Sequence, residues 1–233
     1  MTYNTTHHPS RELLGSFAEG SLSAGMSVAI SAHVELCAQC RETTSALEAE
    51  ATLNWLQTPA PAKAGIDPDF SHMIEAITSE PQTRAPEVGN FAVNEIHMLE
   101  GSVSLPRVLA KLASEGLVWK KMAGGINQAS VILDNETQCE FIYMKPGSQV
   151  PVHKHRGNEI TLVLDGSFSD EMGHYQESDF VLRNASHQHQ PMSDEGCLCF
   201  AVQDSPLMFT KGLARLLNPF LQYRFRRATS AQA

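Results

Sequence analysis

The sequence predicts an α + β chain of two domains, a small helical bundle followed by an all-β sandwich or barrel. Apolar residues follow helical spacing up to about residue 58, and short β-like runs separated by turn signals begin after Val118. At 42% hydrophobic and 18% charged residues, the 233-residue chain can bury a core. We expect domains at 1–80 and 105–226, a linker at 81–104 and a tail at 227–233.

Three short helices are expected between Ser10 and Thr58. Ser10 is the N-cap candidate of the first helix, and Gly20 is its stop signal. The second helix is expected from about Ser23 to Leu36. The third begins near Ala38 and ends at the proline-rich segment 59–61. The apolar stripe of the first helix consists of Leu13, Leu14 and Phe17.

A fourth helix follows, with Asp67 or Asp69 as its cap. Its apolar residues recur at i, i+3, i+4 and i+7, which is the spacing of one helix face. They are Phe70, Met73, Ile74 and Ile77. This face either packs on the first three helices or lies in a groove on another protein.

The β-like runs of the second half have turn signals between them and no helical segments. This texture is typical of an all-β sandwich or barrel. The runs are 131–133, 141–144, 160–164, 180–182 and 197–202. The tail near the C-terminus is expected to be solvated, including Arg224, Arg226 and Arg227.

Most of the formal net charge of −9 lies in the first domain. Residues 1–80 hold ten acidic and three basic residues, a net of −7, and the rest of the chain carries −2. Such a segment repels nucleic acid, so a basic protein is the better partner, although acidic surfaces also serve solubility alone. With no leader-like start and no run of about 18 apolar residues, we expect a soluble, cytoplasmic protein without membrane contact.

The pattern His33-x3-Cys37-x2-Cys40 predicts a zinc site. Two cysteines at a helix junction can face one ion, and the histidine lies one helical turn behind them. His7 and His8 are both candidates for the fourth ligand, because spacing does not separate them. A redox role for the cysteine pair is the weaker interpretation, since no βαβ unit precedes it.

A second metal site is predicted by His153-x-His155-x3-Glu159. Histidines two residues apart point to the same face of a strand. The fourth ligand should come from His187 or His189, which have the same spacing further along the chain. Three histidines and one glutamate suit zinc, manganese, iron or nickel.

The five cysteines are an odd number, so a disulfide framework is a poor interpretation. The three outside the zinc motif are Cys139, Cys197 and Cys199. They are either small buried apolar residues or targets of oxidation, with Met144 and Met192 as further candidates.

The second metal motif, flanked by Gly147 and Gly166, resembles the first cupin motif, G-x5-H-x-H-x3-E-x6-G, at every specified position. The second cupin motif is degraded, and only Asp179 and His189 keep the family residues. That register selects His189 over His187. The resemblance implies a cupin barrel, which is a jelly roll, with metal ligands at His153, His155, Glu159 and His189.

The whole chain resembles the ChrR family of zinc-binding anti-sigma factors. The features in common are the His-His-Pro-Ser-x2-Leu-Leu opening, the His33/Cys37/Cys40 motif, the segment from Val152 to Phe168 that contains the first cupin motif, and Cys197-x-Cys199. The resemblance implies that His8 is the fourth zinc ligand of the first site, with a second zinc in the cupin.

The same resemblance implies a regulator, not an enzyme. Its helical domain would hold one extracytoplasmic-function sigma factor inactive, and its cupin domain would trigger release on singlet oxygen or organic peroxide. The expected contact residues are Leu13, Leu14, Phe17, Phe70, Met73, Ile74 and Ile77. The alternative is a metal-dependent cupin dioxygenase, hydrolase or isomerase with an accessory helical domain.

Overall fold

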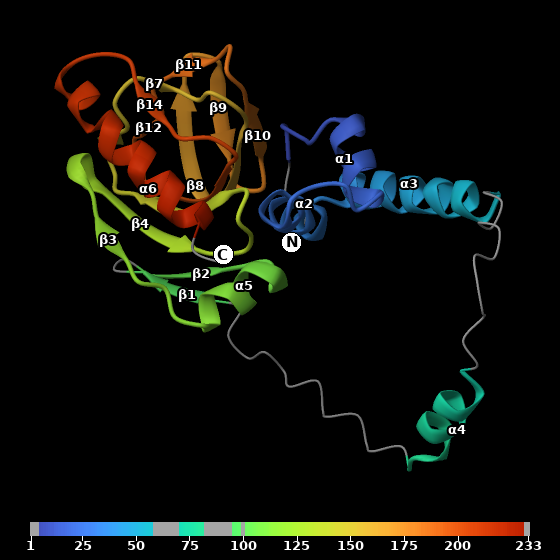
Figure 1. Cartoon of the computed structure of the whole chain (residues 1–233). Helices are drawn as coiled ribbons and strands as arrows, with labels where there is room; N and C mark the ends of the chain where they lie inside the picture. The colour runs from blue at the N-terminus through green and yellow to red at the C-terminus, as the bar shows by residue number, and fades with distance from the viewer. Residues whose placement is uncertain (1–4, 58–69, 82–94, 99–100, 231–233) are drawn as a thin grey trace.

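A computed structural model describes residues 5–57, 70–81, 95–98 and 101–230 of the chain. Helices precede a curled antiparallel sheet (Figure 1), so the predicted α + β class is confirmed. The helices are α1 (Arg11–Ala18), α2 (Ala24–Leu36), α3 (Ala38–Gln57), α4 (Ser71–Ser79), α5 (Arg107–Ser114) and α6 (Asn218–Ser230), with 3-10 turns η1 (Ala123–Gly125) and η2 (Leu213–Leu217). The strands are β1 (Glu95–Met98), β2 (Gly101–Ser104), β3 (Lys120–Lys121), β4 (Ile126–Val131), β5 (Gln138–Met144), β6 (Ser148–Gln149), β7 (His153–Lys154), β8 (Glu159–Asp170), β9 (Gly173–Gln176), β10 (Phe180–Arg183), β11 (Gln188–His189), β12 (Met192–Ser193), β13 (Cys197–Gln203) and β14 (Met208–Phe209).

The first three helices form where the sequence predicted them. Ser10 caps α1, and its hydroxyl accepts a hydrogen bond from Leu13 N at 3.2 Å. Helix α2 lies between α1 and α3 on one side and the β-sheet on the other (Figure 1), and Ala29 and Ile30 on it have no exposed surface. Its core residues join those of the sheet in one apolar cluster, so the helical part and the barrel share a core.

The outer half of α3 and all of α4 face solvent. On α3, Trp55 is 74% exposed, and every residue of α4 is exposed. Packing of α4 on the first three helices is therefore not seen. Phe70 occupies its N-cap position, and the predicted caps Asp67 and Asp69 lie outside the described residues.

The barrel is built from antiparallel strands in the order β3-β4-β5-β13-β8-β12-β6, with β9 and β10 also pairing with β8. A second small sheet has the order β11-β7-β14. The long strand β8 turns at Gly166, which has a φ of 70° and passes so close to Gly196 O that a Cβ would lie 2.2 Å from it. This bend lets β8 pair along both halves of the barrel.

Helix α2 rests directly on the barrel at its N-terminal end. Gly25 N donates a 2.8 Å hydrogen bond to Asp134 Oδ2 in the β4–β5 connection. A Cβ on Gly25 would lie 2.2 Å from Thr137 Oγ1 and 2.6 Å from Cys139 Sγ. Only glycine fits this close approach between helix and sheet.

Two expectations need correction. The range 81–104, expected to be a linker, contains the paired strands β1 and β2. Arg224, expected to be solvated, lies on α6 with its Nη2 2.9 Å from Glu140 Oε1 on β5, whereas Arg226 and Arg227 on the same helix are exposed as expected. The ion pair with a buried carboxylate holds this helix on the barrel, and sequence spacing gave no sign of it.

The apolar stripe of α1 is occupied within the molecule. Leu14 is 3% exposed, and Leu13 and Phe17 pack against the shared core. Leu14 is therefore covered within the chain itself, and the contact role expected for this stripe stays a prediction. No helix in the described part of the chain is long and apolar enough to cross a membrane.

Candidate metal centres

The first centre forms at the corner between α2 and α3. Cys37 interrupts the helix with extended dihedral angles (φ −109°, ψ 112°), and Cys40 lies in the first turn of α3. This corner turns both thiols toward His33 in the last turn of α2, with 3.3 Å between His33 Nε2 and Cys40 Sγ. The donor atoms of His8, His33, Cys37 and Cys40 all lie within 4.8 Å of one another.

The structure separates the two neighbouring histidines of the N-terminal segment. His8 Nδ1 lies 3.5 Å from Cys37 Sγ and 3.4 Å from Cys40 Sγ. His7 points elsewhere, with its Nδ1 3.2 Å from Asp179 Oδ2. His8 is thus the fourth residue of this cluster, as the family resemblance implied.

Burial disfavours the charged forms of two residues of this centre, His33 and Cys40. It lowers the pKa of His33 to about 4 and, together with the neighbouring Cys37, raises the pKa of Cys40 to about 12. Two thiols and two imidazoles in a buried group are the ligands that zinc prefers. This donor set fits a structural zinc ion, which would stabilise the thiolate forms.

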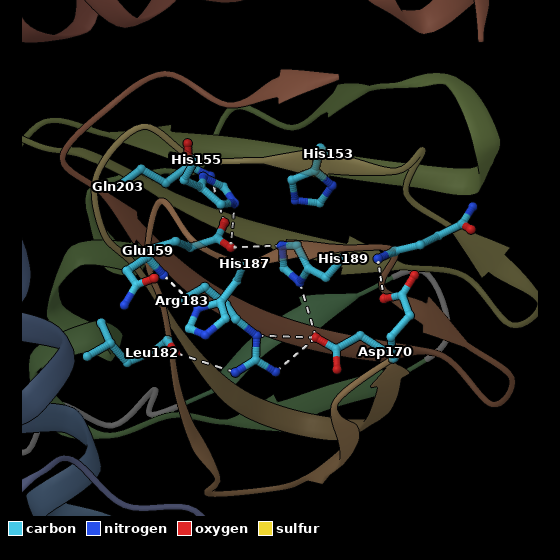
Figure 2. A network of polar contacts seen from close by, with 12 residues as sticks. His153, His155, Glu159, Asp170, Leu182, Arg183, His187, His189 and Gln203 are labelled. Carbon is cyan, nitrogen blue, oxygen red and sulfur yellow. Dashed lines mark hydrogen bonds and ion pairs between the residues drawn. The ribbon is translucent and has the colours of Figure 1, made fainter. Parts of the chain in front are cut away.

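The second centre lies in the barrel, where β7, β8 and β11 meet (Figure 2). His189 on β11 is directly opposite His153 on β7, and Glu159 opens β8. His155 Nε2 lies 2.9 Å, and His189 Nε2 3.6 Å, from Glu159 Oε2. The four donor atoms lie within 4.8 Å of one another, and all four residues are buried.

His187 is the alternative that the structure does not favour. Its Nδ1 accepts a hydrogen bond from Asn184 N at 3.1 Å, and the residue is not part of the buried cluster. It belongs to the turn that leads into β11.

Three outer contacts orient the second cluster. His153 Nδ1 lies 3.0 Å from Pro151 O, and His189 Nδ1 lies 3.1 Å from Asp170 Oδ2. Gln203 Nε2 donates to Glu159 Oε1 at 2.8 Å. Such contacts fix ring orientation and leave the remaining donor atoms for a metal. The sequence analysis did not single out Asp170 and Gln203, because their distances along the chain from His189 and Glu159 follow no recognisable spacing.

Burial and neighbouring charge act on this cluster in opposite directions. Burial lowers the pKa of His153 to about 4. Burial also opposes ionisation of Glu159, but the adjacent imidazoles, His155 first, outweigh it and lower the pKa of Glu159 to about 2. His155 Nδ1 and His189 Nε2 are buried without a hydrogen-bond partner. One carboxylate and three imidazoles with orphaned donor atoms fit a divalent metal ion, whose identity the ligand types leave open.

Comparison with known proteins decides the family. Residues 110–206 match the family model described as the ChrR cupin-like domain. The anti-sigma-E factor ChrR of Cereibacter sphaeroides is 30% identical over 224 residues, which cover 93% of this chain and 98% of that protein. This chain belongs to the ChrR family of anti-sigma factors.

A solved structure resembles the chain over most of its length. In the crystal structure of Rhodobacter sphaeroides SigE in complex with the anti-sigma ChrR, the matching chain is 27% identical with a TM-score of 0.67. The match covers 86% of this chain and 100% of that chain. The likeness extends the ChrR assignment from the cupin domain to the helical part.

In this ChrR family member, the two centres are joined by contacts through the turn between β9 and β10. His33 Nδ1 lies 3.0 Å from Ser178 O, which directly links the first cluster to the barrel. Asp179 Oδ1 accepts hydrogen bonds from the backbone N–H groups of Thr6 and His7 at 2.7 and 2.9 Å. Phe180 N donates to His7 O at 2.9 Å. The barrel therefore holds the segment that carries His8.

The contacts continue from this turn to the cupin centre. Arg183 Nη2 lies 2.9 Å from Asp170 Oδ2, the same oxygen that contacts His189 (Figure 2). Arg183 also donates to the Tyr175 hydroxyl, and the Tyr175 ring stacks edge-on against His7 at 4.8 Å between centroids. One continuous set of contacts thus runs from His189 to the residue beside His8.

The three remaining cysteines are all buried free thiols. Burial raises the pKa of Cys139 to about 12, which disfavours the reactive thiolate. Cys197 and Cys199 are neighbours on β13, with 3.9 Å between their sulfur atoms. A hydrogen bond from Cys199 lowers the pKa of Cys197, which favours its thiolate form, although the residue is only 1% exposed.

Proposed function

We propose that this protein is a zinc-dependent anti-sigma factor. Its helical domain, residues 1–80, sequesters one extracytoplasmic-function sigma factor in a 1:1 complex. The cupin domain releases that sigma factor when singlet oxygen or an organic peroxide modifies it. The observation that carries the proposal is the His8/His33/Cys37/Cys40 cluster at the α2–α3 corner. It is supported by the similarity of the chain to a ChrR protein whose crystal structure was solved in complex with SigE.

Zinc at this cluster would fix the shape of a small domain. It would tie the N-terminal segment, the end of α2 and the start of α3 together through His8, His33, Cys37 and Cys40. Structural zinc sites contribute about 10–16 kcal/mol in zinc-finger peptides, which is large against the stability of a short helical bundle. Loss of the metal would therefore alter the surface offered to a sigma factor.

Charge and exposed apolar surface support a protein partner for this domain. The net charge of −7 over residues 1–80 would attract the basic, DNA-binding surfaces of a sigma factor. Helix α4 presents an unpaired amphipathic stripe, which suits a helix-in-groove contact. Its residues Phe70, Met73, Ile74 and Ile77 are 50%, 53%, 56% and 65% exposed.

Release would use the contacts between the two centres. Singlet oxygen and peroxides attack imidazoles, thiols and thioethers, so the cupin ligands and Cys197 are the proposed targets. A change at His189 would disturb Asp170 and Arg183, and through Tyr175 the segment that holds His8. His8 would then no longer be held in place for the zinc ion, and the complex with the sigma factor would weaken.

The test is co-purification with a co-expressed extracytoplasmic-function sigma factor from the same genome. We expect a 1:1 complex, two metal equivalents per chain, and loss of both one equivalent and the complex in the Cys37→Ser plus Cys40→Ser variant. Cys197→Ser is the control, because this buried thiol lies outside the zinc cluster. A complex that persists without the N-terminal metal would refute the zinc-dependent step.

The competing function is a metal-dependent cupin enzyme. Iron in the cupin centre together with turnover of a small substrate would favour it. Tightly bound zinc without turnover would favour the regulator. Metal analysis of the purified protein and oxygen-consumption assays distinguish the two.

A further inference from the structure

The barrel contains a partly open cavity of about 360 Å³ beside the cupin centre. Small-molecule sites span roughly 300–1,000 Å³, and an engineered apolar cavity of roughly 150 Å³ binds benzene. This cavity can therefore hold a molecule about twice the size of benzene.

Most of the cavity wall is apolar. Residues from β4, β5, β8 and β10 and the loop before β7 contribute to it. Among them are Ile126, Ile142, Met144, Val150, Phe168 and Val181. Such a lining selects an apolar molecular body and offers little to a polar one.

One wall of the cavity is formed by the metal centre. His153, Glu159 and His189 line it. The other charged groups of the lining are already paired, since Arg183 contacts Asp170 and Arg224 contacts Glu140, each at 2.9 Å. A divalent ion among three neutral imidazoles and one carboxylate leaves a net charge of +1 at this wall. Among the described lining residues, that wall is where an anionic group would find uncompensated positive charge.

The C-terminal segment covers the cavity without being buried itself. Leu217 and Phe220 line the cavity, yet they are 51% and 56% exposed, and α6 has no buried residue. Polar contacts hold this segment on the barrel. Asn218 Oδ1 accepts a 2.8 Å hydrogen bond from Phe209 N, Asn218 Nδ2 donates a 3.0 Å hydrogen bond to Phe209 O, and Arg224 pairs with Glu140. A bound apolar molecule would give the two exposed side chains the apolar neighbours that they lack.

From these observations we infer that the cupin cavity binds an apolar monocarboxylate. Its body would lie among the apolar side chains beneath α6, and its carboxylate would face the wall formed by His153, Glu159 and His189. The inference extends the proposed sensor role, because it gives the cupin domain a ligand as well as a metal. Its test contains no sigma factor, so its failure would leave the sequestration proposal standing.

The test is calorimetric titration of the full chain, loaded with two equivalents of zinc, with octanoate. Octanol and octyltrimethylammonium have similar apolar bodies with neutral and positive head groups. We expect saturable 1:1 binding of octanoate, at least tenfold tighter than octanol, and no binding of the cation. In cobalt-loaded protein, octanoate should also change the visible absorption spectrum. Equal affinity for octanoate and octanol, or no saturable binding, would overturn the inference.

Two matched variants place the ligand in this cavity. Val181→Phe fills it from β10 and should weaken octanoate binding at least tenfold, with two zinc equivalents retained. Leu182→Phe is the control, because Leu182 follows Val181 on the strand, points to the opposite face and is 41% exposed. The affinity of this variant for octanoate should stay within twofold of that of the parent protein. If Val181→Phe does not fold, Val150→Phe fills the cavity from a loop. Unchanged binding in the folded filled variant would place octanoate elsewhere.

Discussion

Single residues in this protein hold positions that sequence motifs do not mark. Asp170 is the clearest case, since its carboxylate contacts His189 Nδ1 at 3.1 Å and Arg183 Nη2 at 2.9 Å. The contact fixes which imidazole nitrogen faces the metal cluster. Gly25 is another, because its missing side chain lets α2 touch the barrel.

We expect Asp170→Asn to weaken metal binding at the cupin centre by about 10–100-fold, the usual effect of losing a contact behind a metal ligand. Zinc competition with a chelator measures this affinity. Asp165→Asn, an exposed position on the same strand, is the control and should match the parent protein. Unaltered affinity in Asp170→Asn would mean that His189 is oriented by other groups.

Gly25→Ala should destabilise the protein by about 1–3 kcal/mol, because the new methyl group meets Thr137 and Cys139. The control is Gly15→Ala on α1, where nothing lies within 4 Å of the new Cβ. That change should be neutral or stabilise the helix by up to about 1 kcal/mol. Denaturant unfolding of both variants measures the difference, and similar stability in the two would show that the α2–barrel contact can relax.

At the scale of elements, α2 connects the two halves of the molecule. Its N-terminal end is tied to Asp134, and its C-terminal end carries His33, which contacts Ser178 O. Its middle is buried between α3, α5 and the sheet. A helix held at both ends in this way can transmit a displacement of the barrel to the His8/His33/Cys37/Cys40 cluster as a rigid body.

The Asp134 contact predicts a pH-dependent stability. Burial opposes ionisation, but hydrogen bonds from Gly25, Thr137 and Glu136 lower the pKa of Asp134 below its usual value. A carboxyl group with a lowered folded-state pKa contributes stability above the unfolded pKa of about 3.9, and that contribution is lost as pH falls through the folded value.

Asp134→Asn should therefore be less stable than the parent at pH 7, and the gap should narrow as the solution is acidified below pH 4. Urea unfolding of the two proteins over pH 3–7 measures it. Glu136→Gln, the exposed acidic residue nearby, should show no comparable gap. A gap independent of pH would assign the effect to packing instead of to charge.

At the scale of the whole molecule, the helical part and the barrel are packed together, and each contributes residues to a candidate metal centre. They share a core, and the barrel turn at Ser178–Phe180 positions the N-terminal segment. Under the proposed function, these contacts are the route by which chemistry at the cupin centre would affect the His8/His33/Cys37/Cys40 cluster.

This arrangement predicts that a barrel residue controls the N-terminal zinc. Asp179→Asn should weaken zinc binding at His8/His33/Cys37/Cys40 by about tenfold, because the carboxylate no longer fixes the Thr6–His7 backbone. The cupin centre should keep its affinity. Asp194→Asn, at an exposed position, is the control and should leave both affinities unchanged. Stepwise titration with a chelator measures the zinc affinity of each centre. Equal loss at both centres would indicate general destabilisation.

The sequence by itself determined the fold class, the first three helices and most residues of the two candidate metal centres, because helical spacing and metal-ligand spacing are local signals. Tertiary structure decided what spacing leaves open. It brought His8 and His189, which the family resemblance had implied, into the two clusters, because Asp179 fixes the backbone beside His8 and β11 pairs with β7. It also placed α6 over the cavity, where Arg224 pairs with Glu140. Arg224 and Glu140 are 84 positions apart in the chain, and only packing brings such pairs together.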